Sequence, residues 1–220
     1  VELEDKEVPS IFNDIIFTID EQKLIIATTR PELLPACVAI FYHPDDARYS
    51  MLEGKLAKVP LFDFEVPILP DERANPEKGT GIVMCCTFGD STDVEWQKAH
   101  ELPIKSAINK NGTMSSLAGK YEGMKLKDAR NEIVEDLKQE NLLIKQEPIT
   151  HSVNTHERCG IEIEFLHSKQ WFVKYLDLKN DMLKWGNEIN WYPKHMKNRY
   201  DNWVKGLQWD WCISRQIYFG

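Results

Sequence analysis

The sequence has no long apolar run and no surplus of positive charge. No hydrophobic segment approaches the roughly 18 residues of a membrane-spanning helix, so we expect no membrane partner. The N-terminal stretch VELEDKEVPS is acidic and lacks an apolar core, unlike a signal peptide. Lys and Arg total 27 against 35 Asp and Glu, which gives a net charge of −8. This balance argues against an extended nucleic-acid surface, although a protein that contacts RNA at one small site can be acidic overall.

A disulfide-type cysteine pattern is also absent. The 5 cysteines are an odd number, and two of them, Cys85 and Cys86, are adjacent. We therefore expect free thiols and a reducing, cytoplasmic setting. The sequence contains no internal repeat and no long low-complexity segment. It stops directly after an aromatic-rich stretch, and we expect the chain to be part of a longer protein.

Apolar alternation and turn residues predict mainly strands in the first two thirds of the chain. Strands are expected within 14–29 (two, around a polar turn at 20–23), 37–42, 57–70 (two) and 81–86. Helices are expected from Thr92 to about His100, where Thr92 and Glu95 fit a capping box, and over the amphipathic segment 125–141. Short turns and non-local pairing favour a small barrel over a doubly wound sheet. Beyond them, 151–174 is expected to be extended, and 177–185 and 193–207 helical.

The strand end Thr28-Thr29-Arg30 precedes Pro31, which prevents the strand from continuing. Its hydroxyl and guanidinium donors suit a phosphate or a carbonyl group of a ligand. The alternative is a polar strand terminus that caps a turn, with Arg30 paired to Glu32 or another carboxylate. The residues alone leave both readings open.

A second polar segment joins glycines to two carboxylates. Gly79, Thr80 and Gly81 allow close backbone approach, and Asp90 and Asp93 flank the predicted helix start. The two carboxylates either grip a cationic amine or simply cap the turn and favour the helix dipole.

The cysteines give weaker signals. Cys85 and Cys86 point to opposite faces of their strand, so we expect core residues rather than a nucleophile. His156 and Cys159 have the spacing of half a zinc site. No second pair of that spacing appears, so we expect no structural zinc within this sequence.

Five ordered motifs together resemble the large class I aminoacyl-tRNA synthetases for valine, isoleucine and leucine. The motifs are Thr28–Glu32, Gly79–Val83 with Asp93, His156–Gly160, Lys169–Val173 and Asp210–Gln216. The first two are similar to signatures of the editing (CP1) domain, and the last three resemble the return into the catalytic domain. The valine member fits best, and the segments 33–37 and 86–90 resemble its archaeal-like branch. Leu33, Met84 and Gly89 stand where the commoner bacterial pattern has threonine, lysine and histidine.

The resemblance implies a mixed α/β, mainly β fold. It implies an N-terminal linker at 1–12, a β-barrel-like editing domain with inserted helices at 13–150, and a helical and extended return segment at 151–220 that leads into a Rossmann-type catalytic domain. The ATP-binding signatures lie outside this sequence. No cofactor is therefore implied for this chain, whereas ATP and magnesium are implied for the full-length enzyme.

The implied reaction is hydrolysis of threonine wrongly attached to valine tRNA, because a hydrophobic pocket cannot strongly reject an isostere that adds a hydroxyl. The partners are the tRNA 3′ end, the threonyl-adenosine moiety and the rest of the synthetase. The resemblance implies that Asp93 binds the α-amino group with Asp90 assisting, and that Thr28 and Arg30 position the ester and adenosine. Further substrate-binding residues are Thr29, Glu32, Gly79, Thr80, Gly81 and Cys86. No side chain is a convincing nucleophile, so we expect a positioned water to attack directly.

Two alternatives stay open at this point. The chain could bind a tRNA end without catalysis, or it could be an isoleucine-type editing domain that acts on valyl-tRNA. Hydrolysis of threonyl and valyl esters separates all three possibilities.

Overall fold

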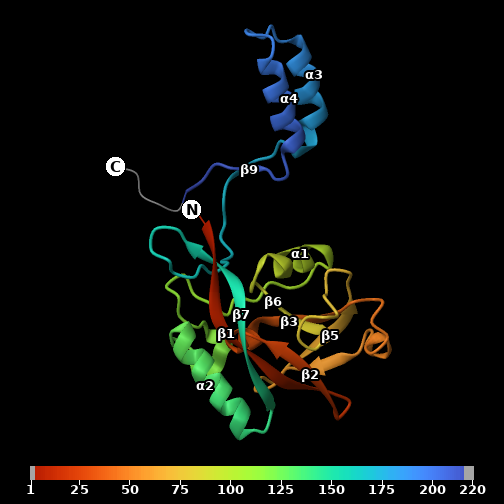
Figure 1. Ribbon diagram of the computed structural model, residues 1–220, viewed down its shortest axis with the longest axis vertical. Coiled ribbons are helices and arrows are strands. Elements are labelled where there is room, and N and C mark those ends of the chain that lie inside the picture. Colours follow the sequence, from red (N-terminus) through yellow and green to blue (C-terminus); the bar gives the residue numbers. More distant parts are fainter. Residues whose placement is uncertain (1–2, 216–220) are drawn as a thin grey trace. The chain divides into compact units, whose positions relative to one another are not determined.

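The computed structural model describes residues 3–215, and the chain divides into two compact units at residues 167 and 168. The first unit is mixed α/β and mainly β (Figure 1). Its elements are β1 (Leu3–Ile19), β2 (Gln22–Thr28), β3 (Cys37–Tyr42), β4 (Leu56–Lys58), β5 (Glu65–Pro70), β6 (Ile82–Cys86), α1 (Ser91–Ala99), α2 (Leu126–Gln139), β7 (Leu143–His156) and the 3-10 helices Pro31–Ala36, Ser50–Leu52 and Ser116–Tyr121.

The sheet of the first unit runs in the order β2-β1-β4-β5-β3-β6, and β7 pairs with β1. All pairings are antiparallel except that of β3 with β5. Although β2 and β6 stand at opposite ends of this order, they approach each other, so the sheet is curled like half a barrel. Figure 1 shows this curled sheet with α1 and α2 outside it.

Two apolar clusters hold the first unit together. The larger contains the inward faces of the strands and the buried face of α2, formed by Ala129, Ile133 and Leu137. The smaller joins α1 to β3, where Trp96 stacks on Phe41 with ring centroids 4.6 Å apart. As expected for neighbours on a strand, Cys86 belongs to the larger cluster and Cys85 to the smaller one.

The predicted strands and the helix at 125–141 are confirmed, but the capping of α1 is different from the prediction. Its N-cap is Asp90, not Thr92, and the reciprocal partner at the third helical position is Asp93, not Glu95. The N-cap therefore lies two residues earlier than predicted. The carboxylate of Asp90 accepts a hydrogen bond from the Asp93 amide, which satisfies a free donor as well as a threonine hydroxyl would.

The linker predicted at 1–12 is largely strand over the residues that the structure describes. From Leu3 onward β1 pairs with β7 in one long ladder that reaches His156. The predicted boundaries at 12/13 and 150/151 thus fall inside paired strands. They do not separate compact structural units, and the division into functional segments stays a prediction. This ladder joins segments far apart in sequence with mostly exposed side chains, so apolar periodicity could not reveal it.

The second unit contains β8 (Phe172–Val173), a 3-10 turn at Leu176–Leu178, α3 (Lys179–Glu188), α4 (Met196–Gly206) and β9 (Trp211–Cys212). The two helices confirm the helical segments predicted near 177–185 and 193–207. Asp210 accepts hydrogen bonds from the amides of Tyr175 and Leu176, at 3.0 and 3.1 Å. The last residue of the motif at 210–216 lies outside the described residues.

Candidate functional site

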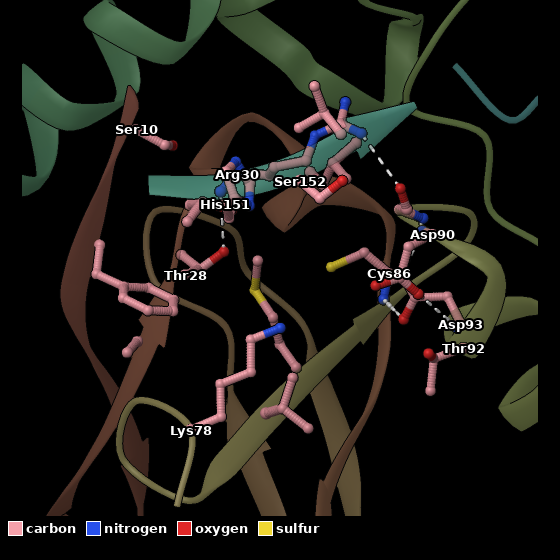
Figure 2. Close-up of a pocket in the computed structure, with 18 of the residues that line it drawn as sticks. Ser10, Thr28, Arg30, Lys78, Cys86, Asp90, Thr92, Asp93, His151 and Ser152 are labelled. Carbon is pink, nitrogen blue, oxygen red and sulfur yellow. Dashed lines mark hydrogen bonds between the residues drawn. The ribbon is translucent and has the colours of Figure 1, made fainter. Parts of the chain in front are cut away.

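A cavity of about 530 Å³ in the first unit is lined by residues of β1, β2, β6, α1 and β7. Figure 2 shows Cys86, Asp90, Thr92 and Asp93 grouped along one side of it. Thr28 and Arg30 lie on another side, and Thr29 also lines the cavity. The end of β2 therefore meets the turn and helix start at 86–93, which lie more than fifty residues later in the sequence.

Asp93 is almost completely buried, with 7% of its surface exposed. Its Oδ1 accepts a hydrogen bond from the Cys86 amide at 3.3 Å. Its Oδ2 accepts from the amides of Gly89 at 2.9 Å and Asp90 at 3.2 Å. Burial, and then the charge of Asp90, raise the pKa of Asp93 to about 7 in spite of these bonds. Asp93 therefore shapes the turn that precedes α1 and titrates near neutral pH.

Asp90 has the less engaged carboxylate of the pair. Its Oδ1 accepts the Asp93 amide at 3.0 Å as the N-cap of α1, and the residue is exposed at the cavity. Two carboxylates at a helix N-terminus create a local negative charge that suits a cationic group.

Arg30 takes part in a dense charge network. Its Nε donates to Glu32 at 3.0 Å, its Nη1 to the Gly89 carbonyl at 3.3 Å, and its Nη2 to both oxygens of Glu164 at 2.9 and 2.7 Å. Burial lowers the pKa of Arg30, but the charges of Glu32 and Glu164 outweigh it, so the pKa is raised. Arg30 is thus paired with carboxylates, as expected if it only stabilises the strand end. Binding of substrate by Arg30 stays a prediction.

Glu32 is not among the residues that line the cavity. It is fully buried and also accepts two hydrogen bonds from Arg130, at 2.8 and 2.7 Å. A buried carboxylate held by two guanidinium groups fixes the strand end. Thr28 contributes to the same turn, because its hydroxyl accepts the Arg30 amide at 3.1 Å.

Gly79, Thr80 and Gly81 form the turn that enters β6, beside the cavity lining rather than within it. A side chain at Gly79 would come within 2.9 Å of the Ala27 Cβ, and Gly81 has a φ of +83°. The glycines therefore permit a close approach of this turn to β2, and a role of the three residues in binding substrate stays a prediction. Cys86 does line the cavity, and burial raises the pKa of its thiol well above the usual value.

All three departures from the commoner pattern, Leu33, Met84 and Gly89, line the cavity. A Cβ added to Gly89 would lie 2.5 Å from Asp93 Oδ2 and 3.3 Å from a Leu33 methyl group. Glycine therefore lets the turn close tightly around the Asp93 carboxylate.

Sequence reasoning missed the wall that comes from β1, β7 and the segment after β7. This wall includes Ser10, His151, Ser152, Asn154, Glu162 and Glu164, together with Lys78 from the turn before β6. These residues carry no motif, and the β1–β7 pairing is what brings Ser10, His151, Ser152 and Asn154 to the cavity. His156 and Cys159 lie near each other, with Nδ1 and Sγ 3.4 Å apart, but residues 3–215 contain no cluster of three or more metal-ligating side chains.

Comparison with known proteins defines the class. The family model described as tRNA synthetases class I (I, L, M and V) matches residues 1–220. The chain therefore belongs to the class I tRNA synthetases. It is 54% identical over 221 residues to valine–tRNA ligase of Rickettsia conorii and 52% identical over 222 residues to that of Rickettsia canadensis. It is 53% identical over 203 residues to that of Rickettsia felis. This confirms the predicted similarity to the valine enzymes, while the branch stays a prediction.

The chain spans only part of these relatives. The matches cover 100%, 100% and 91% of the chain, but 27%, 27% and 23% of the ligases. Among solved structures, the ternary complex of Agrobacterium radiobacter K84 agnB2 LeuRS with tRNA and LeuAMS matches with a TM-score of 0.48 and 15% identity. That match covers 70% of this chain and 24% of the other, a similarity too low to bear on function. In residues 3–215 we find no helix with the length and apolar character to cross a membrane.

Proposed function

We propose that the cavity hydrolyses the ester bond of threonine misattached to valine tRNA, as an editing domain within a valine–tRNA ligase. The observation that carries this proposal is the convergence of Thr28, Thr29, Asp90 and Asp93 on one cavity. A ligand with an ammonium group, a hydroxyl and an ester carbonyl needs carboxylates and hydroxyl groups together in a confined space. The similarity to valine–tRNA ligases supports valine tRNA as the partner.

The ammonium group of the substrate lies against Asp90 and Asp93 in this proposal. Asp90 makes the direct contact more readily, because both oxygens of Asp93 already accept backbone hydrogen bonds. The approach of a cation also favours the ionised form of Asp93, whose pKa is raised to about 7. Thr28 and Thr29 face the hydroxyl and ester groups.

The attacking group is a water molecule in this proposal. The Cys86 thiol is protonated at neutral pH, because burial raises its pKa, and a thiol attacks poorly without ionisation. Holding water and ester in one geometry supplies much of the rate by itself. ATP and magnesium belong to the proposal for the full-length ligase and not to this cavity, and so does the cytoplasmic setting.

Hydrolysis of aminoacyl-tRNA by the purified chain tests the proposal. We expect threonyl-tRNA for valine to be deacylated at least about tenfold faster than valyl-tRNA. The threonine hydroxyl can form a hydrogen bond in the cavity that valine cannot form, and one such bond contributes enough free energy for this difference. Preference for valyl-tRNA would instead indicate an isoleucine-type editing domain. Binding of the tRNA end without hydrolysis of either ester would indicate a binding module and would refute the proposed reaction.

Asp90→Asn is the sharpest variant for this assay. Asparagine caps a helix as well as aspartate, so α1 keeps its N-cap while the charge disappears. We expect deacylation of threonyl-tRNA to fall at least about tenfold, from the loss of a charge-assisted contact. Asp45→Asn is the matched control, because the Asp45 side chain is 95% exposed and does not line the cavity.

A further inference from the structure

The cations around the cavity are not equivalent. Arg30, Arg73 and Arg130 line it, and each is paired with carboxylates. Lys78 also lines it, but within residues 3–215 its ammonium group has no hydrogen-bond or ion-pair partner. Figure 2 shows the Lys78 side chain reaching from its turn into the cavity. An unpaired ammonium group directed into a cavity is available to an anionic ligand.

His151 lies close enough to Lys78 for the lysine charge to affect the pKa of the imidazole. Burial lowers the pKa of His151, and the charge of Lys78 is the next cause. Arg130 and Arg30 lower this pKa further, whereas only Glu162 raises it. The surroundings of His151 are therefore electropositive. Within the described part of the chain, the imidazole has no hydrogen-bond partner, so it is free to donate to a ligand oxygen.

The other side of the cavity carries acidic groups instead. Asp90 and Asp93 lie together there, and the charge of Asp90 helps to raise the pKa of Asp93. One cavity thus presents carboxylates on one side and an unpaired lysine with a histidine on another. A ligand that fits both carries an ammonium group at one end and an anion at the other.

We propose that Lys78 and His151 bind the phosphate group of a nucleotide whose attached amino acid places its ammonium group against Asp90 and Asp93. This proposal rests on the proposed function and names the end of the cavity that holds the nucleotide. Lysine serves as a point charge for phosphate, and a neutral imidazole donates one hydrogen bond. Two sources supply this chemistry: the phosphodiester next to the terminal adenosine of a tRNA, and the phosphate of a threonyl-adenylate.

Calorimetric titration with two pairs of non-hydrolysable analogues tests the phosphate end. The first pair is adenosine with threonine joined through a 3′ amide, with and without a 5′ phosphate. The second pair is threonyl-sulfamoyl-adenosine, which imitates the adenylate, and its uncharged counterpart with a neutral linker. We expect the anionic group to strengthen binding about tenfold in at least one pair. A gain in the first pair assigns the site to the RNA, and a gain in the second assigns it to the adenylate.

Lys78→Met should remove that gain and leave the affinity for the phosphate-free analogue unchanged. His151→Phe should reduce the gain by a smaller factor. Lys98→Met is the matched control, because Lys98 is an exposed lysine on α1 outside the cavity lining. Absence of a gain in the wild type, or an undiminished gain in Lys78→Met, overturns the proposal. If the anionic group strengthens binding but threonyl-tRNA is not hydrolysed, the proposed reaction is wrong, whereas the assignment of Lys78 and His151 as the phosphate-binding residues is supported.

Discussion

The buried carboxylate of Asp93 predicts an unusual pH dependence of stability, which Asp93→Asn would expose. The pKa of Asp93 is raised to about 7, first by burial and then by the charge of Asp90, from an ordinary value of 3.8. Between these two values the folded chain holds a proton that the unfolded chain has released. The free energy of unfolding therefore falls as pH rises through this window, and the penalty is complete above the folded pKa.

The magnitude follows from the size of the shift. Each pKa unit corresponds to about 1.4 kcal/mol. The raised pKa of Asp93 therefore lowers the free energy of unfolding of the wild type by roughly 3 kcal/mol as the pH rises from 5 to 8. Asparagine at this position does not titrate. It loses part of the bonding to the amides of Cys86, Gly89 and Asp90, but that loss does not depend on pH. The stability of wild type relative to Asp93→Asn should therefore fall by roughly 3 kcal/mol across this range.

Urea denaturation of both proteins at pH 5, 6, 7 and 8 measures this difference. Asp90→Asn provides a second test, because it removes the second cause of the raised pKa while the helix cap is kept. In that variant the transition should move to lower pH. A stability difference that stays constant from pH 5 to pH 8 would refute the raised pKa and the burial argument behind it.

The remaining predictions concern the turn, the charge network and the metal. Gly89→Ala should destabilise the fold by about 1–3 kcal/mol and reduce deacylation, because the added methyl group would lie 2.5 Å from Asp93 Oδ2; unchanged melting and activity would contradict this. Arg30→Ala should lower the melting temperature by several degrees, since breaking a buried ion pair costs about 3 kcal/mol, and titration with threonyl and valyl adenosine analogues then shows whether binding also weakens for both. His156 and Cys159 should not retain zinc through dialysis against a chelator, because two ligands leave the metal mostly hydrated; stoichiometric zinc by metal analysis would be the opposite result.

Local patterns in the sequence determined much of the secondary structure. The strands within 14–29 follow from apolar residues around a polar turn, and the strand at 37–42 from a short continuous apolar run. Helix α2 follows from the spacing of Ala129, Ile133 and Leu137. The ordered motifs also indicated the family, which the match over residues 1–220 confirms. These features depend on neighbours in sequence, so one chain without its structure is enough to recognise them.

Tertiary structure alone decided which polar groups face one another. Thr28 and Asp93 line one cavity only because the sheet curls until β2 meets β6. Arg30 was predicted either as a ligand for substrate or as the partner of Glu32 or another carboxylate. Folding adds Glu164, from a segment 134 residues away, to the pairing with Glu32. Lys78 and His151 belong to no motif. Lys78 comes from the turn before β6, and His151 reaches the same cavity because β7 pairs with β1. Residue type sets what each group can do, whereas its partners and its pKa come from long-range contacts that no local pattern contains.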